Sequence, residues 1–224
     1  MTSQYIDCHT HIQCENCIYN RKYEETEHTC GNCKYTSYGL HPWQAGDSNA
    51  DEIIKKLKEL IQNKSINFVG ECGLDTKLCS VDIDIQIKYF KQQIVISEEN
   101  NMPMVIHCVG EIDRLRRIRS EMKAKQQWIF HSFSSSYQTG NQLMNDGFVL
   151  SVGKYVLNRN NKKITRTLEE AYERKQLLLE TDQEEGKLIN INDIYEAASE
   201  RLDVDSNTIN NQIEETISKL LLHQ

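Results

Sequence analysis

Short apolar runs alternate with amphipathic segments along most of this 224-residue chain, and this alternation constrains the fold more than any other feature. The apolar runs, which predict β-strands, cover residues 5–12, 17–19, 34–40, 66–71, 104–107, 127–131, 147–152 and 176–182. The amphipathic segments, which predict helices, cover residues 50–63, 83–100, 111–125, 136–145, 162–174, 191–202 and 206–222. Eight strands that alternate with helices are typical of an α/β protein whose parallel sheet closes into a (β/α)8 TIM barrel.

The predicted barrel is compact, because the chain is short for eight full strand–helix units. The segments that follow the first and second strands are too short for full helices, so we expect the outer helical layer to be reduced after strands 1 and 2. We expect one TIM-barrel domain, spanning residues 1–224, with a sizeable core.

Acidic residues outnumber basic residues by 33 to 26, which leaves a net charge of -7. We see no stripe of lysine and arginine, so the sequence predicts no surface for duplex nucleic acid. No run approaches about 18 apolar residues, and the amino terminus carries no apolar signal region. We therefore expect a cytoplasmic protein with no membrane contact that is a monomer or a weak homo-oligomer.

Two histidines, His9 and His11, stand two residues apart in the first predicted strand. Side chains alternate between the two faces of a strand, so both imidazoles should point the same way. Such a pair can bind one divalent metal, or it can be two ordinary polar residues at a strand end. The choice between these readings depends on how the later strands end.

Four further strands end in residues that can bind a metal: Glu71 ends the fourth, His107 the fifth, His131 the sixth and Asp182 the eighth. The carboxyl ends of all strands in a parallel barrel lie on one rim, where such barrels carry their active sites. An unspecialised rim would carry a mixture of Ser, Thr, Asn, Lys and Asp. Four imidazoles and two carboxylates instead predict a metal site.

Six ligands are too many for one zinc ion and suit two divalent ions close together. We expect Glu71 to bridge the two ions. The predicted ligands of one ion are His9, His11 and Asp182, and those of the other are His107 and His131. The ions would lower the pKa of a shared water to make hydroxide, and Asp182 could take the proton as general base. This donor set suits Zn, Mn, Fe or Ni, and suits Mg less well.

The chain resembles the TatD family of metal-dependent hydrolases, a branch of the amidohydrolase-like barrels. The matching motifs occur in family order at residues 6–11, 39–42, 69–75, 102–107, 129–134 and 178–182. The resemblance implies a phosphodiesterase-type activity, often that of a deoxyribonuclease or exonuclease. It also implies that the six residues above are the metal ligands, and that His41 and Asp75 line the site.

Three departures from the family pattern leave the substrate open. No basic residue follows His107 in residues 108–111, Ser135 stands where the family usually has glycine, and the acidic segment 183–186 replaces a Pro/Arg-rich one. The ends of nucleic acids and small phosphodiesters are both possible substrates. The alternatives are a small-molecule phosphoesterase, an amidohydrolase acting on a C–N bond, and a metal-binding barrel without enzymatic activity.

Three residues near the predicted mouth are candidate substrate contacts. His41 could donate a hydrogen bond to a phosphate oxygen during catalysis, or it could hold the loop at Pro42. Trp43 and Phe133 could each stack on a base, as aromatic residues do in single-strand binders, or could cover the rim as apolar lids. Asp75 joins this group through the resemblance.

Two Cys-x-x-Cys pairs, Cys14 with Cys17 and Cys30 with Cys33, fall outside the family pattern. The pairs are 12 residues apart, which is plausible spacing for a structural zinc bound by four thiolates. Both pairs should lie at the end of the barrel opposite the mouth, where outer helices are missing. Free thiols or two redox pairs are the other readings.

Overall fold

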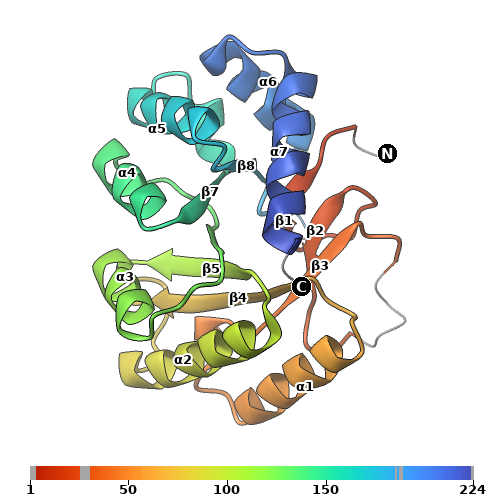
Figure 1. The fold of residues 1–224 in the computed structure, drawn as a ribbon, viewed down its shortest axis with the longest axis vertical. Helices are drawn as coiled ribbons and strands as arrows, with labels where there is room; N and C mark the ends of the chain where they lie inside the picture. Colours follow the sequence, from red (N-terminus) through yellow and green to blue (C-terminus); the bar gives the residue numbers. More distant parts are fainter. Residues whose placement is uncertain (1–3, 26–30, 185, 187–188, 223–224) are drawn as a thin grey trace.

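The computed structural model describes residues 4–25, 31–184, 186 and 189–222. In this part of the chain, eight strands form one sheet in chain order, and each neighbouring pair is parallel (Figure 1). The strands are β1 (Asp7–Thr10), β2 (Cys17–Asn20), β3 (Tyr35–Tyr38), β4 (Phe68–Asp75), β5 (Met104–Val109), β6 (Trp128–Phe130), β7 (Phe148–Val152) and β8 (Leu177–Leu179). The predicted strand order is confirmed.

The first and last strands meet and bring the sheet close to a closed barrel. The backbone N–H of Asp182 donates to the carbonyl of His9 at 3.0 Å, and that of His11 donates to the carbonyl of Gln183 at 2.9 Å. Both bonds lie near the carboxyl ends of β1 and β8, on the rim of the barrel. The TIM-barrel-like α/β fold predicted from the alternating pattern is therefore confirmed.

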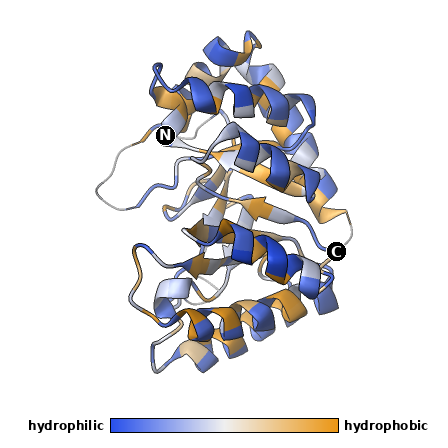
Figure 2. Ribbon diagram, turned by 90° about the vertical axis from the view of Figure 1, so that its left-hand side faces the viewer, coloured by the Kyte–Doolittle hydropathy of each residue, from blue (hydrophilic) through white to orange (hydrophobic). Residues whose placement is uncertain are grey.

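Within the described residues, seven α-helices surround the sheet: α1 (Ala50–Gln62), α2 (Ile83–Asn100), α3 (Ile112–Glu121), α4 (Tyr137–Asn145), α5 (Lys162–Glu173), α6 (Ile191–Leu202) and α7 (Ser206–Leu221). Two short 3-10 helices, η1 (Pro42–Gln44) and η2 (Lys154–Leu157), were not expected. The helices carry hydrophilic and hydrophobic residues on different sides, so each can bury one face against the strands (Figure 2). None of the helices in the described ranges is long and apolar enough to cross a membrane.

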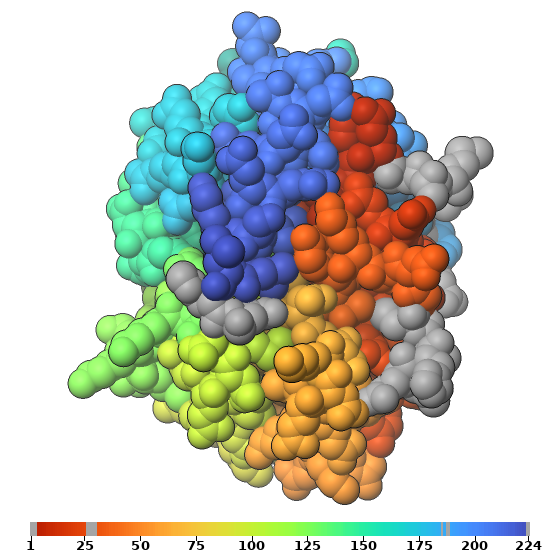
Figure 3. Space-filling model, turned by 45° about the vertical axis from the view of Figure 1, so that its right-hand side comes forward, coloured from red at the N-terminus to blue at the C-terminus, as the bar shows by residue number. Residues whose placement is uncertain are grey.

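The outer layer is thin over the first strands, as the sequence predicts, because the described residues between β1 and β3 contain no helix. Helix α7 covers part of this region, and it lies beside the amino-terminal strands in Figures 1 and 3. The Asn210 side chain accepts a hydrogen bond from the backbone N–H of Ile6 at 3.0 Å. Glu214 forms an ion pair with Lys34 at 3.0 Å. The carboxyl-terminal helix thus supports the start of the barrel.

Strand β4 runs further than predicted, from Phe68 through Glu71 to Asp75. Gly70 and Gly73 have φ values of +137° and +145°, which side chains rarely adopt. A Cβ atom at Gly73 would lie 1.9 Å from the carbonyl oxygen of His107, so the backbones of β4 and β5 could not approach this closely. The two glycines therefore let β4 bring Glu71 and Asp75 next to the histidine of β5.

Candidate metal centre

Glu71 is the centre of the side chains that converge at the barrel mouth, and it is 4% exposed. Its Oε1 atom lies 2.8 Å from His107 Nδ1 and 2.7 Å from His131 Nε2. Its Oε2 atom lies 3.4 Å from His9 Nε2 and 3.5 Å from His11 Nε2. Each carboxylate oxygen thus faces a different pair of imidazoles.

Asp182 extends the group on the side of Glu71 Oε2. Its Oδ1 atom lies 3.8 Å from His9 Nε2 and 3.6 Å from His11 Nε2. The structure thus brings together all six residues that the sequence singled out. Three overlapping groups have their ligand atoms within 4.8 Å of one another: His9, His11 and Glu71; His9, His131 and Asp182; and His41, Glu71 and His107.

The grouping differs in two respects from the predicted division of ligands between two ions. His131 lies close to His9 and Asp182 as well as to His107. The distance from His131 Nε2 to His107 Nδ1 is 3.2 Å. His41, expected to contact substrate, lies inside the cluster with its Nε2 atom 3.4 Å from Glu71 Oε1.

The carboxylates and imidazoles of the mouth shift one another's pKa values. Burial opposes ionisation of Glu71, yet His131 and the other surrounding histidines hold its pKa well below the usual range. Burial also opposes protonation of His131, but Glu71 and Glu180 raise its pKa well above its ordinary value. In the same way Asp182 and Glu71 raise the pKa of His11 against the effect of burial. The site therefore attracts positive charge, which protons or metal cations can supply.

The donors at the mouth fit divalent metal ions. His9 has no exposed surface, and neither of its ring nitrogens has a hydrogen-bond partner. An unpartnered buried nitrogen is costly, and a metal bond to Nε2 would offset part of that cost. Imidazole and carboxylate donors together suit Zn, Mn, Fe or Ni.

Asp75 has no exposed surface, so a substrate cannot contact it directly. It instead orients the histidine of β5. Its Oδ2 atom lies 3.1 Å from His107 Nε2 and accepts a hydrogen bond from Trp43 Nε1 at 2.8 Å. The carboxylate favours the His107 tautomer that carries its proton on Nε2. The lone pair of Nδ1 then faces Glu71 and is free to bind a metal. This assignment corrects the substrate-contact role expected for Asp75.

Two further positioning residues escaped the sequence reasoning. Glu180 has no exposed surface, accepts a hydrogen bond from the backbone N–H of Ser132 at 2.6 Å, and lies 3.5 Å from His131 Nδ1. Asn20 ends β2, and its side-chain oxygen accepts a hydrogen bond from the backbone N–H of Glu71 at 3.0 Å. Like the six ligands, Asn20 lies at the carboxyl end of a strand, so its position alone could have indicated it. Its amide is not a typical ligand of these metals, unlike the histidines and carboxylates.

The two aromatic candidates have different positions. Trp43 is 47% exposed and its ring lies 5.0 Å from that of His41, so it remains a candidate substrate contact. Phe133 has no exposed surface and packs against Phe130, with 5.9 Å between ring centroids. A substrate cannot reach Phe133 here, and the expectation that it stacks on a base is corrected.

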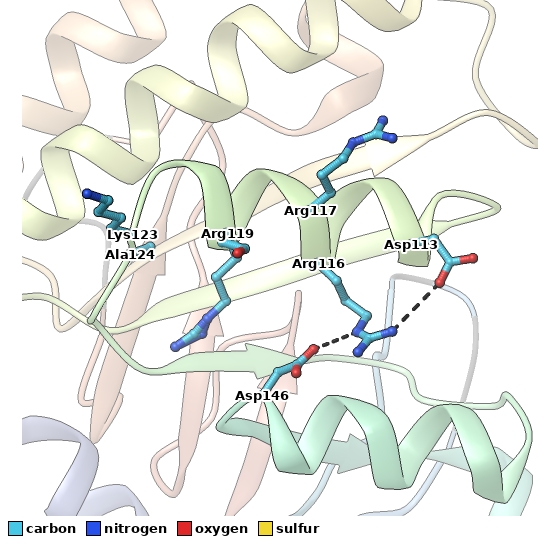
Figure 4. A pocket seen from close by; sticks show the side chains of 8 residues that line it. Asp113, Arg116, Arg117, Arg119, Lys123, Ala124 and Asp146 are labelled. Carbon is cyan, nitrogen blue, oxygen red and sulfur yellow. Dashed lines mark hydrogen bonds and ion pairs between the residues drawn. The ribbon is translucent and has the colours of Figure 1, made fainter.

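Helix α3 carries four arginines, and three of them, Arg114, Arg116 and Arg117, form ion pairs with acidic side chains. Figure 4 shows a pocket beside this helix, into which Arg116 reaches and pairs with Asp146 at 2.5 Å. Arg119 stacks on Trp128 and Phe148, the first residues of β6 and β7, and so lies at the end of the barrel opposite the mouth. These arginines do not contribute to the candidate metal centre.

The histidine, glutamate and aspartate clusters lie on the carboxyl-end rim of a nearly closed parallel barrel, which is where such barrels carry their active sites. The family model described as "TatD related DNase" matches residues 7–221. The chain therefore belongs to the TatD-related DNase family.

The curated relatives include proteins with and without an assigned activity. The chain is 32% identical over 149 residues to the uncharacterized metal-dependent hydrolase YabD of Bacillus subtilis, a match that covers 66% of this chain and 58% of that protein. It is 25% identical over 150 residues to the 3'-5' ssDNA/RNA exonuclease TatD of Pantoea ananatis, covering 66% of this chain and 57% of that protein. The matches thus span less than two thirds of the length of either relative.

Solved structures show the same fold. The crystal structure of YJJV, a TatD homolog from Escherichia coli, superposes with a TM-score of 0.84 at 17% identity and covers 97% of both chains. A hydrolase TatD family protein from Entamoeba histolytica superposes with a TM-score of 0.78 at 14% identity, with full coverage of both chains.

Proposed function

We propose that this chain is a phosphodiesterase that uses two divalent metal ions to hydrolyse the ends of single-stranded nucleic acid or small phosphodiesters. The observation that carries this proposal is the position of Glu71, whose two carboxylate oxygens face two different pairs of imidazoles. A carboxylate in that position can bridge two cations. The relative named as a 3'-5' ssDNA/RNA exonuclease supports the substrate class.

The side chains near each oxygen of Glu71 are the ligands that we assign to each ion. His9, His11 and Asp182 would hold one with Glu71 Oε2, and His107 and His131 would hold the other with Glu71 Oε1. When bound, divalent ions polarise a phosphoryl oxygen and make water more acidic.

Asp182 is placed to accept a proton from the attacking water. Its side chain is 32% exposed, whereas that of Glu71 is almost fully buried. Burial raises the pKa of Asp182, but His11 and the other nearby histidines more than compensate and lower it below its usual range. The carboxylate is therefore ionised at neutral pH and can act as general base.

His41 acts as a hydrogen-bond donor to the phosphate. Burial lowers its pKa, so the imidazole is neutral at neutral pH. Its Nδ1 atom accepts a hydrogen bond from the backbone N–H of Trp43 at 3.3 Å, which leaves the proton on Nε2. A nitrogen that carries a proton cannot bind a metal, so His41 Nε2 is available to a substrate oxygen instead.

The proposal can be tested with metal-free protein to which Mg, Mn, Zn or Ni is added. The substrates are a single-stranded oligonucleotide, the matching duplex, bis-p-nitrophenyl phosphate and a cyclic amide. We expect metal-dependent cleavage of phosphodiesters, with single strands preferred to duplex at physiological salt. Preferential cleavage within long duplex would contradict the substrate class. Amide hydrolysis without phosphodiester cleavage would make the protein an amidohydrolase and overturn the proposal.

A further inference from the structure

Three cysteines, Cys14, Cys17 and Cys33, lie on neighbouring segments of the chain at the end of the barrel opposite the metal centre. Cys17 is the first residue of β2, and Cys33 stands two residues before β3 begins at Tyr35. Ile18 pairs with Tyr35 in the sheet, so the chain segments that carry Cys17 and Cys33 enter the barrel side by side. The catalytic residues lie on the opposite rim and make no use of these thiols.

Cys14 and Cys17 form one compact unit. The Cys17 thiol donates a hydrogen bond to the backbone carbonyl of Cys14 at 2.9 Å, which folds residues 14–17 into a tight turn. The Cys14 side chain is the largest cause of the raised pKa of the Cys17 thiol. Burial comes next, and the nearby Cys33 thiol adds to the effect. Cys17 has no exposed surface, whereas Cys14 and Cys33 are half-buried.

Two hydrogen bonds tie the turn of Cys14 and Cys17 to the segment before β3. The backbone N–H of Lys34 donates to the carbonyl of Glu15 at 2.9 Å. The backbone N–H of Gly31 donates to the side-chain oxygen of Gln13 at 3.3 Å. The two cysteine-bearing segments are therefore held next to each other by bonds that do not involve the sulfur atoms.

The described residues between β1 and β3 form no helix, and the three cysteines belong to this part of the chain. We propose that Cys14, Cys17 and Cys33 supply three thiolate ligands to a structural zinc ion. Zinc accepts thiolate ligands in tetrahedral sites, and two intervening residues let both sulfurs of a Cys-x-x-Cys pair face one ion. Cys30, the fourth cysteine of the pattern, lies outside the described residues.

Zinc binding requires a small rearrangement and the loss of protons. Among the described residues, the groups of ligand atoms within 4.8 Å of one another all lie at the mouth and contain no sulfur. The three sulfur atoms must therefore move closer together as the ion binds. Each coordinating thiol releases its proton, so binding weakens as the pH falls.

Cobalt substitution of the whole reduced protein tests the site. Thiolate ligands give cobalt an intense near-ultraviolet charge-transfer band that imidazole and carboxylate ligands at the mouth do not produce. We expect this band in the wild-type protein and its loss in Cys14→Ser and Cys33→Ser. As isolated, each of these variants should also contain one zinc ion fewer per chain than the wild type. Cys79→Ser, which changes a half-buried thiol outside the cluster, is the matched control and should retain both.

Two results would overturn the proposal. One is the absence of the band in wild-type protein that is kept reduced and loaded with excess cobalt. This result needs no variant, so it holds even if a serine variant fails to fold. The other is a band and a zinc content that survive in both serine variants. Reductant is present throughout, so that a disulfide between Cys14 and Cys17 cannot conceal the thiolates.

Discussion

Thr181 donates two hydrogen bonds to the carboxylate of Asp7, one from its hydroxyl at 2.6 Å and one from its backbone N–H at 2.9 Å. The two residues are 174 positions apart: Asp7 is the first residue of β1, and Thr181 lies two residues after the end of β8. Asp7 stands two residues before His9, and Thr181 stands immediately before Asp182. The contact therefore joins the two ends of the sheet where both supply residues to the metal centre.

Thr181→Val should destabilise the fold by removing the hydroxyl donor at nearly constant shape. An unpartnered buried acceptor costs about 1–3 kcal/mol in the free energy of unfolding. Burial raises the pKa of Asp7 to about 7, and the Thr181 hydroxyl acts against this by stabilising the ionised form. The loss should therefore be larger well above pH 7 than well below it.

Urea unfolding of metal-free protein at two pH values measures this effect. Thr208→Val is the control, because Thr208 is exposed and its change should alter stability by less than about 0.5 kcal/mol. Equal destabilisation by the two variants would argue against the barrel-closing role of Thr181.

Glu180→Gln should weaken metal binding, because Glu180 favours the His131 tautomer that has its proton on Nδ1 and its lone pair on Nε2. Loss of such a partner typically lowers metal affinity about 10- to 100-fold. Calorimetric titration of apo protein gives the affinity directly. Glu200→Gln removes an exposed carboxylate that pairs with Arg159, and it should bind metal as the wild type does. Unchanged metal affinity in Glu180→Gln would show that Glu180 does not position His131 for metal binding.

His41→Gln tests whether His41 is a hydrogen-bond donor or a metal ligand. Loss of one donor to the transition state typically lowers kcat by about 100- to 1000-fold. We expect a decrease of that order with an unchanged number of bound metal ions, measured by elemental analysis. A variant that lacks one metal ion would show that His41 is a ligand and that its tautomer differs from the one assigned above.

Trp43→Ala should impair the use of oligonucleotides selectively. Base stacking on an aromatic side chain contributes about 1–3 kcal/mol, which corresponds to roughly 5- to 150-fold in KM. A dialkyl phosphodiester has no base and should be hydrolysed with unchanged KM. An equal loss on both substrates would mean that Trp43 acts through its hydrogen bond to Asp75 and not through stacking.

The six mouth ligands could be singled out from the sequence because each lies at or near the carboxyl end of an apolar strand. This rule needs only the order of strands and the geometry of a parallel barrel. It could not foresee that β4 continues past Glu71, since the register between β4 and β5 shifts between Val69 and Cys72. The buried position of Asp75 follows from that continuation.

Local backbone geometry explains the error at Phe133. Ser132 has a φ of 50°, in the left-handed region that non-glycine residues rarely adopt. The chain therefore turns sharply after His131, and the alternation of side chains along β6 no longer predicts where Phe133 points. The positioning role of Glu180 could not be predicted from the sequence either. It depends on a contact with His131, and the two residues follow different strands, β8 and β6.

The most direct test of the account measures bound metal and hydrolysis together in Glu71→Ala. The wild type should bind two divalent ions per chain at the mouth and lose hydrolysis on treatment with a chelator. Glu71→Ala should bind at most one ion at the mouth and show no metal-dependent cleavage of single-stranded oligonucleotide or bis-p-nitrophenyl phosphate. A Glu71→Ala protein that retains both ions and full activity would contradict the bridging role of Glu71 and the binuclear centre built on it.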